Sequence, residues 1–592
     1  MDAKGNGAAT ARGRGRGHHL ALAKTMRVAS MGALMTMLGL VSCKGEPPQK
    51  PVQPAAPEVS AVPEPQDTTA PAAAPDAAAA AAATPGQVAK WWRGAVFYEV
   101  FVRSFYDSNG DSKGDLQGLI DKLDYLNDGD PTGGDDLGVN ALWLMPINPS
   151  PSYHGYDVTD YEGINPDYGT LATYDALVAA AHQRGIRIIA DFVLNHSSSQ
   201  HPWFLSSQLG PDADKRDWYS WRKTPPDEWK RPWDGQPVWH QLGDWYYYAI
   251  FWSEMPDLNL QNPAVEAEMQ DVARFWLGRG QDGFRVDAVR HLFESPEGKL
   301  ADAAANHPFI KRFRAMLDKE HPDAVIVAEA WSGAEDQVLY YGEGDEFQLG
   351  FSFETSEKIR AAVKDGVRSG LDQMLDKAAA TFPDGGFEAP FLTNHDMPRV
   401  MRELGGDAAG MRLAAALVMA WEGSPFMYYG EEIGMQGGAG GGDENKRTPM
   451  RWTADGPAVG FTTGTPWYAV PDEAAGVDVA SQLKDPASLL HLYKNLIALR
   501  QAHPALRLGK QARLDVDAAK GVVVFERATP GERVLLVANL DRAPSEAFEA
   551  PVAGAPKVLL AEGLTGPVAA SGGKLTIPAL APRAFAFIAL GP

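Results

Sequence analysis

Three acidic side chains stand at the ends of short apolar runs, where they could act together in catalysis. Asp287 lies in GFRVDAVRH (283–291), Glu329 in AEAW (328–331) and Asp396 in TNHD (393–396). Two carboxylates about 5 to 5.5 Å apart can cleave a glycosidic bond with retention, one as nucleophile and the other as acid and base. Singly, each acid would most often be a surface or salt-bridged residue. Together they indicate the carboxylate chemistry of a retaining glycosidase.

Arg285 precedes Asp287 by two residues, and residues i and i+2 of a strand share a face. A guanidinium beside a carboxylate lowers the pKa of the acid. We therefore expect Arg285 to keep Asp287 ionised, as a nucleophile must be. Crowding by like charges would hold a proton on the acid partner.

Eight short apolar runs alternate with amphipathic stretches, and this alternation predicts an α/β fold, a (β/α)8 TIM barrel. The expected strands are 95–102, 141–147, 186–193, 283–287, 324–330, 349–354, 389–394 and 424–429. The C-terminal ends of barrel strands meet at one mouth, which would bring the three acids together. A doubly wound open sheet is the alternative, but no GxGxxG fingerprint follows an early strand.

The catalytic barrel is expected to span 89–505, with an inserted domain B at about 196–257 after the third strand. About 90 residues separate the third and fourth expected strands, more than a simple connection needs. Half of the 16 tryptophans lie there, where they would build the insert's own core or stack on sugars at the barrel mouth. Short alternating segments at 506–592 predict a C-terminal antiparallel β-sandwich.

Residues 1–43 have the pattern of a bacterial export signal. Their apolar run at 28–40 is shorter than the roughly 20 residues of a membrane span. It ends in LVSC (40–43), which resembles a lipobox, so Cys43, the only cysteine, is expected to carry a lipid anchor. The Pro- and Ala-rich segment 44–88 reads as a linker. We expect an exported protein attached to the cell envelope through Cys43.

The charge of the chain limits the class of its partner. A net charge of -22 and a pI near 5.0 exclude nucleic acid as the main partner, since phosphates need a basic surface. They fit a monomer that acts on a neutral or weakly charged ligand.

The segment DSNGDSKGD (107–115) offers oxygen ligands at a spacing that resembles a calcium loop. An EF-hand would carry Glu at position 12, where this chain has Gly118. An ordinary Asx/Gly turn is the alternative. The expected Ca²⁺ ligands are Asp107, Asn109, Asp111, the Lys113 carbonyl and Asp115.

Five segments resemble signatures of the α-amylase family of glycoside hydrolases, family 13. They are DFVLNH (191–196), MPDLN (255–259), GFRVDAVRH, AEAW and FLTNHD, in the family's order within about residues 91–592. The resemblance implies the family's barrel, domain B and C-terminal sandwich. It also implies that Asp287 is the nucleophile, Glu329 the general acid/base and Asp396 the acid that supports the transition state.

The same resemblance implies contacts to an α-glucan substrate. Arg285 would orient the nucleophile, and Tyr156 would stack on the sugar at the cleaved bond. The expected substrate-binding residues are His154, Tyr156, His196, Arg285, His291 and His395. A second calcium site through Asn195, Asp257 and the His291 carbonyl is left open.

Within the family, GGGDENKRTPMRW (440–452) resembles the bacterial lipoprotein α-amylases, a group intermediate between oligo-1,6-glucosidases and neopullulanases. We therefore expect retaining cleavage of internal α-1,4-glucosidic bonds of starch and maltooligosaccharides. An exo-acting α-glucosidase or oligo-1,6-glucosidase, or a transglycosylase, is the first alternative. A non-catalytic barrel relative used for binding or assembly is the second. Arg290 leaves one contact open, because the endo-amylase pattern DAxKH has Lys there.

Overall fold

The computed structural model describes residues 90–130, 134–295, 297–382 and 387–591. The predicted signal peptide, Cys43 and the linker to residue 88 lie outside these residues. Within the described part of the chain, no helix combines the length and the apolar character needed to cross a membrane.

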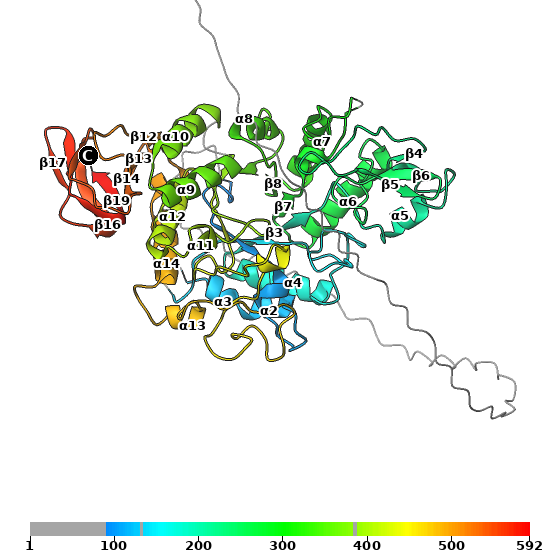
Figure 1. Ribbon diagram of the computed structural model, residues 1–592, viewed down its shortest axis with the longest axis horizontal. Coiled ribbons are helices and arrows are strands. Elements are labelled where there is room, and N and C mark those ends of the chain that lie inside the picture. Colours follow the sequence, from blue (N-terminus) through cyan, green and yellow to red (C-terminus); the bar gives the residue numbers. More distant parts are fainter. Residues whose placement is uncertain (1–89, 131–133, 296, 383–386, 592) are drawn as a thin grey trace, which may run out of the picture. The chain divides into compact units, whose positions relative to one another are not determined.

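Eight parallel strands form the centre of the fold (Figure 1). They are β1 (Phe97–Val100), β2 (Ala141–Leu144), β3 (Arg187–Phe192), β7 (Gly283–Val286), β8 (Val325–Ala328), β9 (Leu349–Phe351), β10 (Glu388–Ala389) and β11 (Phe426–Tyr428). Neighbours in the sheet follow the chain order, and β11 pairs with β1. A parallel bridge from Phe391 to Phe426 joins the two remaining edges. The predicted (β/α)8 barrel is confirmed, with a strand at each of the eight predicted positions.

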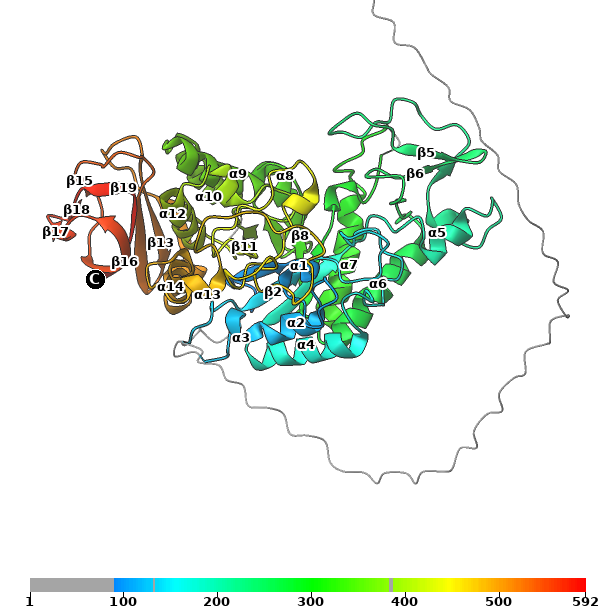
Figure 2. The same ribbon diagram turned by 60° about the horizontal axis from the view of Figure 1, so that its bottom comes forward.

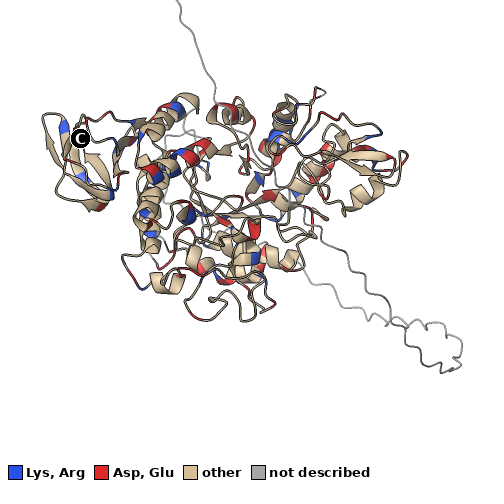
Figure 3. Ribbon diagram, viewed as in Figure 1, with Lys and Arg blue, Asp and Glu red and all other residues tan. Residues whose placement is uncertain are grey.

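The longer helices surround these strands, and Figure 2 shows α2, α4, α6 and α7 along one side. Their bounds are α2 (Leu116–Asp121), α4 (Leu171–Gln183), α6 (Pro263–Gly278), α7 (Asn306–Glu320), α9 (Phe353–Asp365), α10 (Ser369–Thr381), α12 (Ala408–Ala420) and α14 (Leu489–Ala502). Asn262 caps α6 by accepting the N–H of Ala264, with Pro263 in the first turn. Figure 3 shows acidic and basic residues side by side on helices such as α9.

Shorter segments complete the helical content. They are α1 (Val102–Phe105), α3 (Leu123–Leu126), α5 (Pro202–Ser207), α8 (Ala334–Gln337), α11 (Val400–Glu403), α13 (Val479–Gln482) and α15 (Pro504–Leu508), with 3-10 turns η1 (Arg216–Trp218), η2 (Val289–His291), η3 (Val338–Tyr341) and η5 (Asp443–Asn445). The helices α14 and α15 follow each other directly along the chain, with only His503 between them. Pro504 explains the break, because proline has no N–H to continue a helix but is tolerated in a first turn.

Large aromatic side chains fill the inside of the barrel. Phe351 lies with its ring centroid 5.1 Å from that of Trp143 and 4.8 Å from that of Phe426. Trp143 is fully buried. The barrel is therefore a packed core, and a substrate can reach only its rim.

A small subdomain stands between β3 and α6, in the region predicted as domain B. It contains an antiparallel sheet of order β4 (Trp221–Arg222), β6 (Trp245–Tyr248) and β5 (Trp239–Leu242). In Figure 2 it lies beside the barrel, next to α5 and α6. Trp229 and Trp239 are buried in its core together with Val238 and Ile250.

The C-terminal region folds into two antiparallel sheets, as predicted. The first has the order β12 (Lys510–Arg513), β13 (Val522–Thr529), β14 (Glu532–Asn539), β19 (Leu580–Gly591) and β16 (Ala555–Leu564), and the second has the order β15 (Phe548–Ala550), β18 (Lys574–Ile577) and β17 (Ala569–Ser571). Buried Val524, Val537, Leu575 and Ile577 are among the residues of their shared core. The strands β12, β15 and β17 are short, with four, three and three residues.

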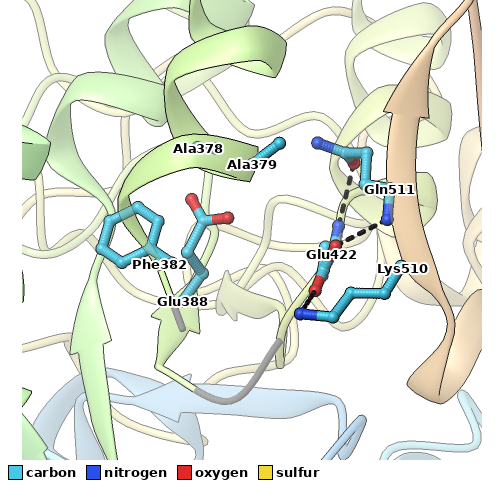
Figure 4. Close-up of a pocket in the computed structure, with 7 residues that line it drawn as sticks. All are labelled: Ala378, Ala379, Phe382, Glu388, Glu422, Lys510 and Gln511. Atoms are coloured by element: carbon cyan, nitrogen blue, oxygen red, sulfur yellow. Dashed lines mark hydrogen bonds and ion pairs between the residues drawn. The ribbon is translucent and has the colours of Figure 1, made fainter. Parts of the chain in front are cut away.

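Polar contacts join β12 to the barrel. Gln511 N–H donates to Glu422 Oε2 at 2.6 Å, and Glu422 N–H donates to Gln511 Oε1 at 3.1 Å (Figure 4). Lys510 Nζ lies 3.6 Å from Glu422 Oε1. Glu422, Lys510 and Gln511 line a small cavity together with buried Glu388. Burial, and then the nearby charge of Glu422, raise the pKa of Glu388 to about 8.

Candidate active site

The three predicted catalytic acids lie together at the C-terminal end of the barrel. Asp287 follows β7 directly, Glu329 follows β8 directly, and Asp396 lies in the loop after β10. All three line one cavity of about 260 Å³. The convergence arises because parallel strands of a barrel all end at the same rim.

Arg285 is the centre of this acidic group. Its guanidinium is fully buried, with Nη1 2.8 Å from Asp287 Oδ1 and Nη2 3.0 Å from Glu329 Oε2. It also forms an ion pair with Asp191, at the same level of the neighbouring strand β3. One cation is therefore shared by three carboxylates. Glu329 Oε2 accepts a further hydrogen bond from Ala288 N–H at 2.9 Å.

Arg285 lowers the pKa of Asp287, as expected, but does not bring that pKa below its ordinary value. Burial raises the pKa of Asp287 well above its ordinary value, and the neighbouring acids Glu329 and Asp191 add to the rise. Burial likewise raises the pKa of Glu329. Arg285 lowers the pKa of both acids, but one shared guanidinium does not compensate for the loss of solvation. Because the two acids share this cation, ionisation of one disfavours ionisation of the other.

Asp396 has the opposite electrostatic environment. Its Oδ2 lies 3.2 Å from His395 Nε2, and its Oδ1 lies 2.9 Å from Arg447 Nη2. Burial by itself would raise the pKa of Asp396, but His395 and Arg447 outweigh it and hold the pKa well below its usual range. Burial would also lower the pKa of His395, but Asp396 and Glu99 raise it to about 9. Asp396 is therefore an anion beside two cations at neutral pH.

Tyr156 and His395, two of the predicted substrate-binding residues, contact the acidic residues of the site. The Tyr156 hydroxyl lies 2.7 Å from His395 Nε2 and donates to Asp191 Oδ2 at 3.2 Å. The two rings are stacked, with centroids 5.7 Å apart and an interplanar angle of 16°. His395 Nδ1 contacts Glu99, a buried acid of β1.

His154 and His196 line the cavity, whereas His291 is not among its lining residues. His196 is buried, its Nε2 has no hydrogen-bond partner, and burial lowers its pKa to about 3. It is thus a neutral ring with an unused nitrogen, suited to a sugar hydroxyl. His291 Nδ1 instead bonds the Leu300 carbonyl at 2.8 Å, and its ring lies edge-on against Phe251.

Several residues of the site were not predicted as such. Asp191 opens DFVLNH and Arg447 lies in GGGDENKRTPMRW, so both stand inside segments that the sequence analysis singled out. Glu99 is the one charged residue of the apolar strand β1, and this isolated charge could have marked it as a functional residue. Phe251 and Met255 line the cavity from the inserted segment. Met255 opens MPDLN, another segment that the sequence analysis singled out, whereas no pattern marked Phe251.

Arg290, where the endo-amylase pattern has Lys, forms contacts within the protein. Its Nε and Nη2 donate to the two carboxylate oxygens of Asp302, Nε at 2.9 Å and Nη2 at 2.5 Å. Its Nη1 donates to the Trp331 carbonyl. Arg290 thus links the loop after β7 to the loop after β8 and is not among the residues that line the cavity.

The predicted calcium loop is held together by its own hydrogen bonds. Both carboxylate oxygens of Asp107 and of Asp115 accept protein donors. Asn109 Oδ1 accepts a hydrogen bond from the N–H of Asp111. Asp111 is an exposed residue. All five expected ligands offer oxygen, the donor that Ca²⁺ prefers. Over the described ranges, however, no three His, Cys, Asp or Glu side chains converge on a point that could hold a metal. Asp107, Asn109 and Asp111 each close an Asx turn by accepting the N–H of the residue two positions later.

Two of the residues left open as a second calcium site, Asn195 and Asp257, contact each other directly. Asn195 Nδ2 donates to Asp257 Oδ2 at 2.9 Å, and Asp257 Oδ1 accepts the N–H of Ile250. Burial raises the pKa of Asp257 well above its ordinary value. This acid therefore serves to join the loop after β3 to the inserted segment.

A parallel barrel with acids at its strand ends around one buried arginine is the arrangement of a glycoside hydrolase. Residues 99–509 match the family model described as the alpha amylase catalytic domain, and residues 510–587 match a domain of unknown function, DUF3459. The chain belongs to the α-amylase family, as the resemblance of its segments predicted.

Individual relatives within the family differ in activity. The chain is 39% identical to alpha-amylase 3 of Dictyoglomus thermophilum over 456 residues, 76% of this chain and 86% of that protein. It is 37% identical to trehalose synthase/amylase TreS of Mycobacterium tuberculosis over 513 residues, 77% of this chain and 82% of that protein. A solved α-amylase from H. orenii superimposes with a TM-score of 0.74 at 37% identity, covering 84% of this chain and 99% of that one.

Proposed function

We propose that this protein hydrolyses internal α-1,4-glucosidic bonds of starch and maltooligosaccharides with retention of configuration. The observation that carries the proposal is the pair Asp287 and Glu329, bound to one guanidinium at the floor of a solvent-reaching cavity. The relatives named α-amylase support the class of substrate.

The roles of the acids are those of a retaining glycosidase, assigned by the resemblance of their segments to the family's. In this mechanism Glu329 carries the proton, and Asp287, which pairs with Arg285, is ionised. The Asp287 carboxylate bonds to the anomeric carbon while the glycosidic oxygen departs with the proton of Glu329. Glu329 then takes a proton from water, whose oxygen attacks the anomeric carbon and releases Asp287. Asp396, ionised beside His395 and Arg447, stabilises the positive charge of the oxocarbenium-like transition state.

We also propose that the enzyme is exported and anchored to the bacterial cell envelope by a lipid on Cys43. The support is the LVSC segment after a short apolar run, followed by a Pro- and Ala-rich tether of 45 residues (44–88). In this proposal the barrel acts as a monomer at the end of that tether.

Product analysis tests the activity. We expect purified enzyme to release maltooligosaccharides of intermediate length from soluble starch at the earliest times, with a fast loss of iodine staining. The first products should carry the α configuration, measured by NMR within minutes of mixing. Glucose alone as the initial product would refute internal cleavage.

One observation favours the exo-acting alternative. On the Asp396 side, the cavity is lined by Arg447 and Asp443, and Arg447 pairs with both Asp396 and Asp443. A charged, ion-paired wall of this kind would stop a glucan chain from continuing past the cleaved unit. Glucose from maltotriose would support this alternative, and conversion of maltose to trehalose would support the transglycosylase named among the relatives. The convergent acids speak against a non-catalytic role.

Calcium binding by the loop at 107–115 is a separate proposal, supported by its five oxygen donors. We expect excess EDTA to lower the melting temperature by about 4 °C or more, because an ion that binds only the folded state stabilises it. Added Ca²⁺ should restore the original value. Asp111→Ala should remove the response to EDTA, whereas Asp318→Ala, a change to an exposed acid of α7, should keep it. An unchanged melting temperature in EDTA would leave the loop as a hydrogen-bonded turn.

A further inference from the structure

Trp233 is a large apolar side chain that the inserted subdomain leaves half exposed, at 51%. A singly exposed tryptophan is not unusual, so its contacts must show whether it has a role. Trp233 lies in the segment from Lys230 to Pro237, two residues that form an antiparallel bridge. The feature is therefore a tryptophan carried on a short closed loop.

The loop is built to hold this ring in place. Arg231 donates from Nε to Asp234 Oδ1 at 2.8 Å and from Nη1 to the carbonyl of Phe251. The Arg231 guanidinium carbon lies 5.4 Å from the centre of the Trp233 ring. These contacts fix the tryptophan before any ligand arrives, which reduces the entropy lost on binding.

A continuous set of rings connects Trp233 to the cavity. Trp233 stacks on Phe251, with centroids 5.4 Å apart and an interplanar angle of 28°. Phe251 lines the cavity and lies 5.4 Å from the ring of His196. Trp233 itself does not line the cavity, so a sugar at the cleaved bond does not reach it. Only a glucan chain that extends out of the cavity past Phe251 would reach Trp233.

A short stretch of backbone also joins Trp233 to the two catalytic acids. Ala288 follows Asp287 directly, donates its N–H to Glu329 Oε2 at 2.9 Å and immediately precedes η2. At the end of η2, His291 lies edge-on against Trp233, with centroids 5.7 Å apart. Trp233 is thus linked through η2 to the acids at the cleaved bond.

We propose that Trp233 is a stacking platform for a glucosyl unit of the substrate beyond those at the cleaved bond, and that it favours long chains over short ones. The proposal rests on the proposed function. The flat apolar face of an α-linked glucose unit fits the exposed face of an indole ring, and both surfaces leave water on contact.

The test compares Trp233→Ala with Trp233→Phe on two substrates. We expect Trp233→Ala to lower kcat/KM for maltoheptaose about tenfold, equivalent to about 1.4 kcal/mol. The value for maltotriose should change less than twofold, because this substrate is too short to gain from the platform. In a Glu329→Gln background, calorimetry should show about tenfold weaker binding of maltoheptaose, and Trp233→Phe should retain most of the affinity.

Trp252→Ala is the matched control, since Trp252 is 49% exposed in the same subdomain but stands outside the Phe251–Trp233 stack. It should leave both substrates unaffected. Equal losses on maltotriose and maltoheptaose, or no loss with Trp233→Ala, would overturn the proposal. These outcomes differ from failure of the proposed function, which would appear as glucose-only products from starch by the unmodified enzyme. If Trp233→Ala does not fold, Trp233→Phe and Trp233→Leu carry the comparison.

Discussion

Replacement of Asp287 by asparagine is expected to lower kcat on maltoheptaose by about 10,000-fold or more, the scale of losing a covalent nucleophile. The amide has the shape of the carboxylate but neither its charge nor its ability to form the glycosyl-enzyme. Arg285 keeps Asp191 and Glu329 as partners in this variant, so the fold should persist. The melting temperature and the rate of reducing-sugar release measure the two parts of the prediction.

Asp282→Asn is the matched control for this variant. Asp282 is a buried acid directly before β7, at the opposite end of the strand from Asp287. It pairs with His182 at 2.7 Å and with Arg187 at 2.9 Å, away from the cavity. Its loss should reduce stability and leave kcat within a few fold. More than about 1% residual activity in Asp287→Asn would mean that another group is the nucleophile.

Replacement of Arg285 by methionine is expected to destabilise the fold by about 3–5 kcal/mol at neutral pH, because it leaves buried carboxylates without their cation. Asp191, Asp287 and Glu329 all lose this partner. Removing Arg285 also removes an interaction that lowers the pKa of Asp287 and Glu329, so their folded-state pKa values rise further. The folded variant then binds more protons than the unfolded chain, and its stability falls as pH rises.

Denaturant unfolding at pH 4.5 and pH 7.5 measures this effect. The loss of unfolding free energy relative to the unmodified protein should be larger at pH 7.5 than at pH 4.5. Arg187→Met is the control, because Arg187 pairs with Asp282 through a half-exposed side chain. It should cost about 1 kcal/mol or less. A pH-independent loss in Arg285→Met would show that the effect is one of packing and not of charge.

Local patterns were enough to predict the barrel. Each strand is a short apolar run, and the fully buried strands β1, β2 and β7 show why the runs are continuous. The acids Asp287 and Glu329 follow the last residue of their strands, so their position at the rim came from chain order alone. The two-residue strand β10 gave little such signal, and its run at 389–394 became mostly loop.

Contacts between distant segments were beyond the reach of local pattern. Phe251 comes from the insert and lines the cavity only because domain B is placed beside η2. Arg447 reaches Asp396 across 51 residues of chain. The strands β15 and β17 have three residues each, too few for alternation to be recognised.

The sequence by itself determined the kind of protein: a (β/α)8 barrel with acids at strand ends, because strand length, alternation and the residue after each strand are local properties. Only the tertiary structure decided how these acids ionise. Burial depends on everything packed around a group, and Arg285 proved to be shared by three carboxylates where one partner, Asp287, had been expected. The same holds for Arg290, whose partners Asp302 and the Trp331 carbonyl could not be predicted from the sequence. The type and spacing of charged residues can be read from the sequence. Their burial and their ion-pair partners are set only when distant segments pack together.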